Sequence, residues 1–260
     1  MPQSPLLAVM IAAARKAARG LRRDFGEAEA LQVSRKGAAD FVSAADLKAE
    51  QTVFEELERA RPKYGFLMEE RGEIEGADNS NRWIVDPLDG TTNFLHGLPH
   101  CAISIALERD RQPYAGVIYN PITDDLFTAE KGQGAFHNDR RLRVSARRQI
   151  AEALIATGMP FHGKSGHGVF LKELQSVMEA TAGVRRYGAA SLDLAWLAAG
   201  RFDAFWERNL KPWDVAAGIV LVKEAGGLVG EIEGGDRPHL AGSILATNGE
   251  LSDAMRRLLT

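Results

Sequence analysis

The sequence has a single cysteine among 260 residues, and its six histidines are scattered. One thiol cannot form an intramolecular disulfide, so Cys101 is predicted to pack beside Ile103 as a small apolar residue. The histidines do not recur at the short spacings of zinc ligands. These absences exclude a disulfide-stabilised scaffold and a metal site built on imidazole or thiolate ligands.

A large excess of charge of either sign is also lacking, because 32 Lys and Arg stand against 35 Asp and Glu, which gives a net charge of -3. This slight acidity argues against a nucleic-acid-binding surface spread over the whole protein. One short basic cluster, Arg140–Arg143 with Arg147 and Arg148, is interpreted as a solvated edge. A patch for RNA or a protein partner is the alternative interpretation.

No apolar run is long enough to cross a membrane. The segment Leu6–Ala18 is apolar, but Arg15 and Lys16 interrupt it and no basic segment precedes it, which is unlike a secretory signal. Its apolar residues have helical spacing, so we expect an amphipathic helix packed on the body. A cytoplasmic protein is therefore predicted.

Secondary-structure signals change near residue 146. Before it, a capping-box pattern at Ser43–Asp46 begins a helix that Pro62 ends, and strands are predicted at Gly65–Glu69, Arg82–Asp86, Ala102–Leu107, Ala115–Tyr119 and Asp125–Glu130. Such closely spaced strands favour an antiparallel sheet. After it, helices at Phe170–Ala182, Ser191–Ala199 and Trp213–Ala225 alternate with short strands, including Ala204–Trp206 and Ile244–Thr247. This order predicts an α+β fold of layered sandwich type.

The most informative segment runs from Trp83 to Phe94, with the sequence WIVDPLDGTTNF. Its first three residues are typical of a buried strand. Pro87 cannot donate a ladder hydrogen bond, so the chain is expected to leave the sheet directly after Asp86. Asp86 and Asp89 would then lie together at the carboxyl end of a strand.

The residues after these acids suit a phosphate. Gly90 allows the backbone to approach a ligand closely, and Thr91–Asn93 can begin a helix whose free N–H groups face an anion. A metal held by Asp86 and Asp89 would lie beside that anion. A turn capped by Asp and Thr side chains is the structural alternative.

A second segment, Lys211–Gly218, also brings an acid to the start of a helix. Pro212 suits the first helical turn, and the glycine pair at 226–227 ends the helix. Asp214 then lies in the first turn, where compensation of the helix dipole would also explain it.

These acids favour a hard cation if they converge with Glu69, which ends an earlier predicted strand. Each pair of carboxylates about 4 Å apart would cost about 4 kcal/mol at an effective dielectric constant near 20. The cluster would then need protons or cations. Oxygen ligands without thiolate or imidazole select Mg²⁺, with Mn²⁺ as a possible substitute, over Zn²⁺.

Together these segments closely resemble the inositol monophosphatase family of magnesium-dependent phosphatases. The first signature of the family matches Trp83 to Phe94, and the second matches Trp213 to Gly227. Met68–Glu70, Tyr187–Ala190 and Glu207 fit in their spacing, so that the resemblance spans nearly the whole chain. Arg71-Gly72, after the paired acids, stands at a position where family members vary.

The resemblance implies an αβαβα sandwich of the sugar phosphatase type. Residues 1–145 would form an α+β subdomain with the main metal and phosphate motif. Residues 146–260 would form an α/β subdomain with Glu207 and Asp214. The active site would lie between them, and both would form one compact catalytic unit.

The resemblance also implies the metal ligands. Glu69, Asp86 and the Leu88 carbonyl would bind one ion, and Asp86, Asp89 and Asp214 a second, so that Asp86 bridges them. Two ions can stabilise the attacking and leaving oxygens of an in-line displacement, and one can lower the pKa of a water.

Further roles follow from the same resemblance. Thr91, hydrogen-bonded with Asp46, would orient the attacking water, and with Glu69 these are the predicted catalytic residues; a helix cap alone would also explain Asp46. The implied substrate site consists of Asp89, Gly90, Thr91, Thr92, Gly188, Ala189, Ala190, Glu207 and Asp214.

Within the implied substrate site, the Gly90 and Thr91 amides would hold the phosphate. Glu207 would bind substrate hydroxyls, although it could instead be a charge on an edge strand. Lys36 and Glu70 are possible additional residues in loops near the site.

The sequence therefore predicts a phosphoric monoester hydrolase for inositol monophosphate or a similar small polyol or sugar phosphate, forming a homodimer as relatives commonly do. Fructose-1,6-bisphosphatase and histidinol-phosphatase activities are alternatives. A nucleotide 3′-phosphatase is disfavoured, because such relatives tend to carry Lys-Glu where this chain has Thr92-Asn93. Association with the transcription machinery, as in some bacterial members, is a further alternative that no sequence feature supports.

One unrelated class of phosphatase has a similar motif. Haloacid-dehalogenase phosphatases use Asp-x-Asp-Gly-Thr, with the first Asp as a covalent nucleophile. This chain has Asp-x-x-Asp-Gly-Thr at Asp86–Thr91, so the first acid is out of register. Attack by a metal-activated water is the predicted mechanism.

Overall fold

The structure, a computed structural model, describes residues 4–25, 33–37 and 40–260, and side chains outside 26–43. Two larger sheets and one small hairpin contain all of its strands. The first sheet has eight strands, in the order β10 (Arg140–Arg141), β9 (Gly134–His137), β8 (Asp125–Glu130), β7 (Gln112–Asn120), β6 (Ala102–Arg109), β5 (Asp78–Asp89), β3 (Tyr64–Met68) and β4 (Gly72–Ile74).

The second sheet has five strands, in the order β12 (Gly183–Arg185), β11 (Leu154–Thr157), β13 (Ala204–Arg208), β15 (Ser243–Thr247) and β14 (Leu228–Gly230). The small hairpin pairs β1 (Val33–Gly37) with β2 (Asp40–Ser43). The helices are α1 (Pro5–Asp24), α2 (Ala44–Ala60), α3 (Thr91–Leu95), α4 (His167–Ala180), α5 (Ala190–Ala198), α6 (Pro212–Glu224), α7 (Pro238–Ala241) and α8 (Ser252–Leu259), with one 3-10 turn at Ile150–Glu152.

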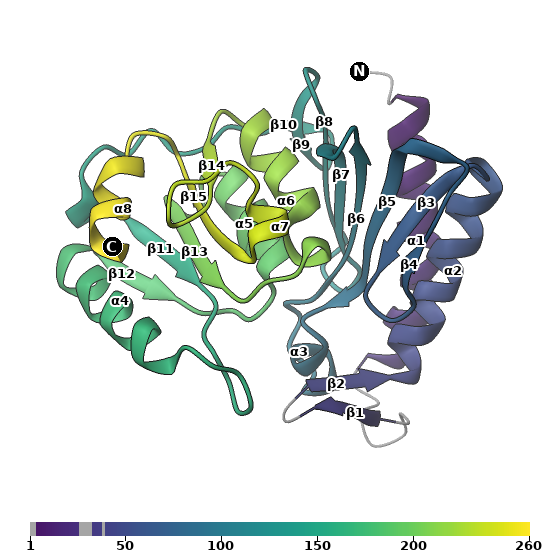
Figure 1. Cartoon of the computed structure of the whole chain (residues 1–260), viewed down its shortest axis with the longest axis horizontal. Helices are drawn as coiled ribbons and strands as arrows, with labels where there is room; N and C mark the ends of the chain where they lie inside the picture. The colour runs from purple at the N-terminus through teal and green to yellow at the C-terminus, as the bar shows by residue number, and fades with distance from the viewer. Residues whose placement is uncertain (1–3, 26–32, 38–39) are drawn as a thin grey trace.

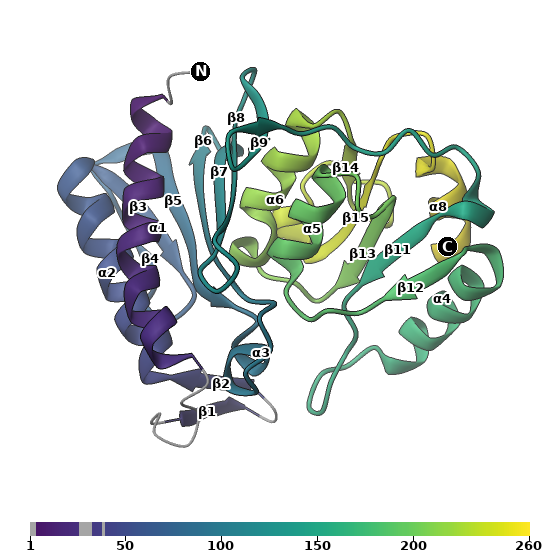
Figure 2. The ribbon, with the colours of Figure 1, turned by 180° about the vertical axis from the view of Figure 1, so that it is seen from behind.

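Helices and sheets alternate in five layers (Figures 1 and 2). Helices α1 and α2 cover one face of the first sheet, α5 and α6 lie between the two sheets, and α4 and α8 cover the outer face of the second sheet. Three buried apolar clusters fill the four boundaries between these layers, because the cluster around α5 and α6 contacts both sheets. The predicted αβαβα sandwich is confirmed.

Strand β6 shows why both faces of the first sheet are covered. Ile103, Ile105 and Leu107 point to the α1–α2 side, whereas Ala102 and Ala106 point to the α5–α6 side. Successive strand residues face opposite ways, so a continuous apolar run indicates a sheet buried on both faces. The small residues on the second face let α6 pack closely.

Gly116 of β7 lies directly against α6. A Cβ added there would lie 2.6 Å from the carbonyl oxygen of Ala217. Any larger residue would push the helix away from the sheet. This contact fixes α6 and hence the acid at its start.

The prediction of an entirely antiparallel first sheet is wrong at one place. Strands β3 and β5 are parallel. The short strand β4 lies between them in sequence and pairs antiparallel with β3. It reverses the chain an additional time, so β5 runs in the same direction as β3. Both strands therefore bring their carboxyl ends, with Glu69 and Asp86, to the same edge.

Pro87 does not end its strand as predicted. Strand β5 continues to Asp89, and its register with β6 shifts between Asp86 and Asp89. Pro87 lies in this bulge, where its missing N–H breaks no ladder hydrogen bond. The bulge aims the two acids differently from a regular strand.

Part of the predicted solvated basic edge has a structural role. Arg147 Nη1 lies 2.8 Å from Oδ1 of the fully buried Asp203, whose carboxylate also accepts from the Leu154 amide at 2.7 Å. This buried carboxylate needs partners. Arg140, Arg141 and Arg143 are exposed, as predicted.

Two other predictions are confirmed. Helix α1 buries its apolar face, including Met10 and Leu21, against the first sheet. Cys101 is buried in the same cluster as Ile103. Among the described residues, no helix is both long and apolar enough to cross a membrane.

Candidate active site

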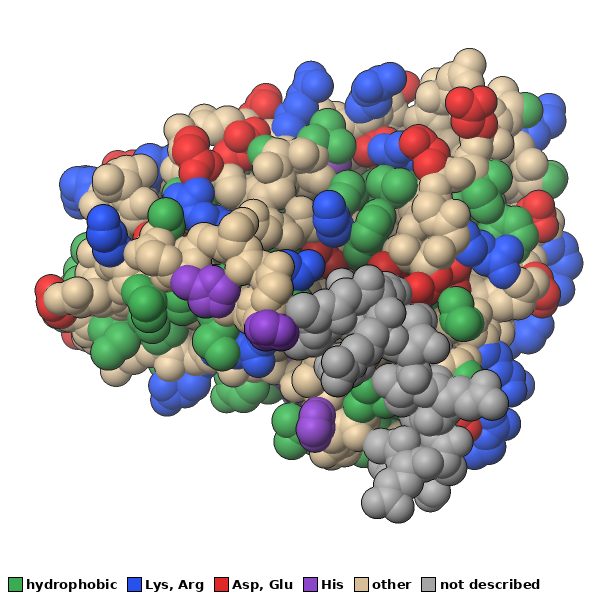
Figure 3. Space-filling view, turned by 60° about the horizontal axis from the view of Figure 1, so that its bottom comes forward, with side chains coloured by type: hydrophobic (Ala, Val, Ile, Leu, Met, Phe, Trp, Pro, Cys, Tyr) green, Lys and Arg blue, Asp and Glu red, His purple; other side chains and the backbone are tan. Residues whose placement is uncertain are grey.

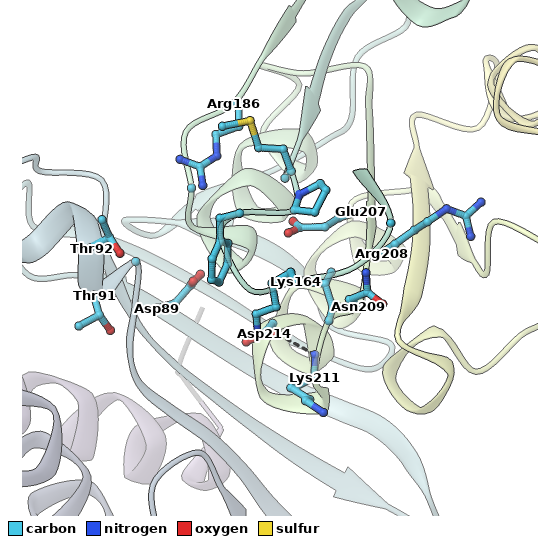
Figure 4. A pocket seen from close by; sticks show the side chains of 18 of the residues that line it. Asp89, Thr91, Thr92, Lys164, Arg186, Glu207, Arg208, Asn209, Lys211 and Asp214 are labelled. Carbon is cyan, nitrogen blue, oxygen red and sulfur yellow. Dashed lines mark hydrogen bonds between the residues drawn. The ribbon is translucent and has the colours of Figure 1, made fainter. Parts of the chain in front are cut away.

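Most of the predicted site residues line a cavity of about 460 Å³ between the two halves of the molecule. Its walls come from the β5–α3 turn, the loop 158–166 before α4, and the segment from β13 to the start of α6. Figure 3 looks onto this side, where acidic side chains gather in a hollow beside the residues that are not described. Figure 4 shows Asp89, Asp214 and Glu207 around the cavity.

The turn from β5 to α3 is fixed by its own backbone. Asp86 is buried, and its Oδ1 accepts a hydrogen bond of 2.9 Å from the Leu88 amide. Gly90 has φ 85°, and a Cβ there would lie 2.9 Å from the His100 carbonyl oxygen. Glycine is therefore required at position 90 by conformation and by space. Helix α3 begins directly after it, as the motif predicts.

Thr91 connects this turn to α2. Its hydroxyl lies 3.0 Å from Asp46 Oδ1 and 3.1 Å from the Leu88 carbonyl oxygen, both of which are acceptors. The single hydroxyl proton is shared between them. Asp46 is 1% exposed. The contact between Thr91 and Asp46 that the resemblance implied is present.

Asp89 has a partner that the sequence did not indicate. Its Oδ2 accepts hydrogen bonds from the Ser191 amide at 2.7 Å and the Ser191 hydroxyl at 2.5 Å. Ser191 lies in the first turn of α5, so an acid there is also favoured by the helix N-terminus. Because Oδ2 is held, Oδ1 is the oxygen of Asp89 through which a cation could bind.

Asp214 closes the start of α6. Its Oδ2 accepts a hydrogen bond of 2.6 Å from the Lys211 amide, which forms a capping box. Pro212 begins the helix, as predicted. The helix thus presents a fixed carboxylate to the cavity.

The carboxylates perturb one another. Burial raises the pKa of Asp86 well above its usual value, and the charges of Glu69, Asp89 and Asp214 raise it further. Burial likewise raises the pKa of Asp89 to about 6 and that of Asp214 to about 8, the latter with a contribution from Asp89. These groups cannot all ionise at neutral pH without a compensating charge.

Such a cluster fits a hard cation in its chemistry, since its donors are carboxylate and carbonyl oxygens. Among the described residues, however, no three His, Cys, Asp or Glu side chains are already placed so that together they could bind an ion.

Glu207 faces the acid cluster from the second sheet (Figure 4). It lies on β13, the middle strand of that sheet, so the alternative of an edge-strand charge is wrong. A Cβ at Gly158 would lie 1.9 Å from the Glu207 carboxyl carbon, so only glycine leaves room for this side chain. Burial and the charges of Asp214, Asp193 and Asp89 raise the pKa of Glu207.

Ten of the predicted residues line the cavity: Glu69, Asp86, Leu88, Asp89, Gly90, Thr91, Thr92, Gly188, Glu207 and Asp214. The lining does not include Asp46, which reaches it through Thr91, nor Ala189 and Ala190, which are buried in the core. It also leaves out Glu70, whose amide donates to Glu50. The Lys36 side chain lies outside the described residues.

Sequence reasoning missed three cationic residues of the cavity lining, Lys164, Arg186 and Arg208 (Figure 4). The charge of Lys164 offsets part of the rise in the pKa of Asp214, and that of Arg186 offsets part of the rise in the pKa of Glu207. Arg208 is paired with Glu173 at 2.7 Å. No motif marked these residues, because loop cations in sequence are usually solvated.

Comparison with known proteins agrees with this geometry. The sequence pattern of the inositol monophosphatase family matches residues 2–259. The chain belongs to the inositol monophosphatase family. The prediction of a phosphoric monoester hydrolase is thereby confirmed at the level of the family. Members of this family are metal-dependent.

Relatives within the family cover almost the whole chain. The inositol-1-monophosphatase of Caulobacter vibrioides is 64% identical over 245 residues, which are 93% of this chain and 96% of that protein. The Nus factor SuhB of Escherichia coli is 41% identical over 97% of this chain and 99% of its own length. The crystal structure of the extragenic suppressor protein suhB from Bartonella henselae has a TM-score of 0.96, with 57% identity and 99% of each chain covered.

Stability of the metal-free protein should depend on pH in a definite direction. The carboxyl groups of Asp89 and Asp214 have pKa values of about 6 and about 8 in the folded protein, whereas the ordinary pKa of Asp is 3.8. The folded state therefore binds more protons across this range, and stability falls as pH rises through it. Mg²⁺ should raise the melting temperature more at about pH 8 than at about pH 5, because protons compete with the metal.

Thermal unfolding followed by circular dichroism at both pH values, with and without MgCl₂, measures this difference. Potassium chloride at the same ionic strength is the control for charge screening. An equal Mg²⁺ effect at both pH values would contradict the assigned carboxylate cluster.

Proposed function

We propose that this chain is a Mg²⁺-dependent phosphomonoesterase that hydrolyses inositol monophosphate or a similar small polyol or sugar phosphate by attack of water. One observation carries the proposal. Four carboxylates, Glu69, Asp86, Asp89 and Asp214, come from three separate segments and line the same cavity as the Gly90 turn.

The proposed metal ligands are four carboxylates and one backbone carbonyl oxygen. Asp86 would bridge two ions, Glu69 and the Leu88 carbonyl would complete one, and Asp89 and Asp214 the other. In Asp89 and Asp214 the Oδ2 atoms are already held by protein donors, which supports binding through Oδ1. When bound, the ions neutralise the acids, lower the pKa of a water and stabilise charge on the leaving oxygen. Mn²⁺ offers the same preference for oxygen and is proposed as a substitute.

Gly90 and Thr91 would hold the phosphate through their amides. Both precede or begin α3, so their N–H groups have no acceptor within the helix. The first turn of a helix favours an anion. Thr92 is exposed beside them and would contact the same group.

The Thr91 hydroxyl would orient the attacking water by accepting a hydrogen bond from it. Its proton is shared between Asp46 and the Leu88 carbonyl, so Oγ1 can only accept a hydrogen bond from any further partner. A water that donates to Oγ1 turns a lone pair toward phosphorus. Asp46 thereby fixes the direction of the hydroxyl without contacting substrate.

Glu207 would bind the hydroxyl groups of the alcohol, since it lies across the cavity from the phosphate motif. Glu207→Ala should lower kcat/KM for inositol monophosphate by about tenfold to a hundredfold, because a hydrogen bond to a charged partner contributes roughly 1.5–3 kcal/mol. Hydrolysis of p-nitrophenyl phosphate, which has no such hydroxyls, should be nearly unchanged. An equal loss on both substrates in steady-state assays would assign Glu207 a structural or chemical role instead.

Release of inorganic phosphate with and without Mg²⁺ tests the proposed function. The substrates are inositol monophosphate, fructose-1,6-bisphosphate, histidinol phosphate and a nucleotide 3′-phosphate. We expect the highest kcat/KM for inositol monophosphate or another polyol phosphate. Preference for the bisphosphate or histidinol phosphate would favour one of the alternative activities, and Mg²⁺-independent release would contradict the proposal.

The proposed setting is a cytoplasmic homodimer, with no membrane partner and without nucleic acid as substrate. Similarity to proteins named SuhB, one of them a Nus factor, supports an additional association with the transcription machinery. Sedimentation of the purified protein measures its oligomeric state, and a pull-down at fixed salt tests the association.

A further inference from the structure

Helix α2 carries two buried acids one turn apart. Asp46 and Glu50 are each 1% exposed and point from the same face of the helix toward the first sheet. Residues four apart share one helix face. Asp46 contacts Thr91, as described above, whereas the proposed mechanism gives Glu50 no role. A buried carboxylate requires partners that compensate for its lost hydration.

The partners of Glu50 lie in the turn after β3. Glu50 Oε2 accepts a hydrogen bond of 2.8 Å from the Glu70 amide, and Oε1 lies 3.3 Å from Arg71 Nε. The Arg71 guanidinium in turn lies 4.9 Å from the centre of the Phe54 ring on the same helix. One side chain of α2 therefore holds two successive residues of this turn.

Glu69 is the first residue of this turn. Its amide donates to the Val85 carbonyl at 3.2 Å, which ties it to β5 one residue before Asp86. On its other side the chain is tied to α2 through the Glu70 amide. Glu69 thus stands between two fixed points, one on the strand that carries Asp86 and one on the helix that carries Asp46.

A role in stability alone explains Glu50 poorly. A buried ion pair often stabilises a protein no more than apolar residues of similar size do, because desolvation offsets the attraction. The same chemistry is common around metal ligands, where outer groups fix the orientation of the binding side chain. The geometry at Glu50 is of this second kind.

We propose that Glu50 is a positioning residue that holds Glu69 for metal binding through the Glu70 amide. The inference rests on the proposed function, because it takes Glu69 as a metal ligand. Helix α2 then supports the site at two points, since Asp46 directs Thr91 and Glu50 directs Glu69. Metal affinity and orientation of the water would be set separately by two acids of one helix.

Glu50→Ala should raise the Mg²⁺ concentration for half-maximal activity by about tenfold or more, the usual range for an outer-shell change. At saturating Mg²⁺, kcat should stay within about threefold of the original value, because Thr91 and Asp46 are untouched. Glu50→Gln keeps an oxygen that can accept from the Glu70 amide, so it should recover part of the affinity. Glu58→Gln, at an exposed position of the same helix, is the matched control and should leave both quantities unchanged.

A second measurement does not depend on turnover. MgCl₂ should raise the melting temperature of Glu58→Gln as it does that of the unmodified protein. In Glu50→Ala the same rise should require about tenfold more Mg²⁺. Circular dichroism without metal checks that Glu50→Ala is folded, and Glu50→Gln supplies the same test if it is not. An unchanged Mg²⁺ requirement in a folded Glu50 variant would overturn the inference and leave the proposed function standing. Absence of any Mg²⁺ response in the unmodified protein would instead contradict the proposed function.

Discussion

Asp86→Asn is expected to reduce kcat/KM by on the order of 10³-fold or more while the protein stays folded. Asp86 is the proposed bridging ligand, so its loss weakens both ions. Lewis-acid stabilisation contributes several kcal/mol, and each 1.36 kcal/mol corresponds to a factor of ten in rate. Asparagine keeps the shape and an oxygen that can accept from the Leu88 amide.

The same substitution, although it lowers activity, should not lower the stability of the metal-free protein. Burial and three neighbouring acids raise the pKa of Asp86, so its ionised form is disfavoured in the metal-free protein. Asparagine removes that charge, and the metal-free variant should melt at the same or a higher temperature above neutral pH. The control is Asp139→Asn, at an exposed position in a turn of the first sheet. A folded Asp86→Asn protein with normal Mg²⁺-dependent turnover would refute the two-ion assignment.

The first motif was predictable because its chemistry is contiguous. Six consecutive positions, from Asp86 to Thr91, specify the acids, the close backbone approach and the helix start. The start of α6 was predictable for the same reason, since Pro212 and Asp214 act on their own helix. Local rules of capping and turn formation are sufficient for such segments.

The arrangement of strands was predicted less well. Strand β4 has three residues, which is too short for its pattern to be recognised in the sequence. It nevertheless determines that β5 runs parallel to β3. The role of Pro87 was also wrong, because a proline can either end a strand or lie in a bulge. Pairing with β6 on the far side of the bulge decides between these outcomes.

Two contacts that support the site were not predictable from sequence. Ser191 lies 102 positions from Asp89, and Glu50 lies 20 positions from Glu70. A serine at a helix start and a glutamate on a helix have ordinary local explanations. Only the packing of α5 and α2 against the first sheet gives them their partners.

Thr91→Ala is expected to reduce kcat by about 10²-fold or more, with a smaller effect on KM. The hydroxyl is the proposed acceptor for the attacking water, and a misplaced nucleophile costs roughly this factor. Phosphate binding uses backbone amides of Gly90 and Thr91, which alanine retains. Steady-state kinetics at saturating Mg²⁺ separate the two parameters.

Thr91→Ser is the matched control, because it keeps the hydroxyl that lies 3.0 Å from Asp46 and 3.1 Å from the Leu88 carbonyl. It should retain most of the activity. Asp46→Asn should resemble Thr91→Ala in its effect on kcat. The asparagine side chain can place either its oxygen, an acceptor, or its nitrogen, a donor, next to Thr91, so the direction of the hydroxyl is no longer fixed. A double variant of both should then lose little more than either alone, because the two residues act as one unit. Full additivity of the two losses would show that Asp46 acts independently of Thr91, and the orienting role of the pair would have to be abandoned.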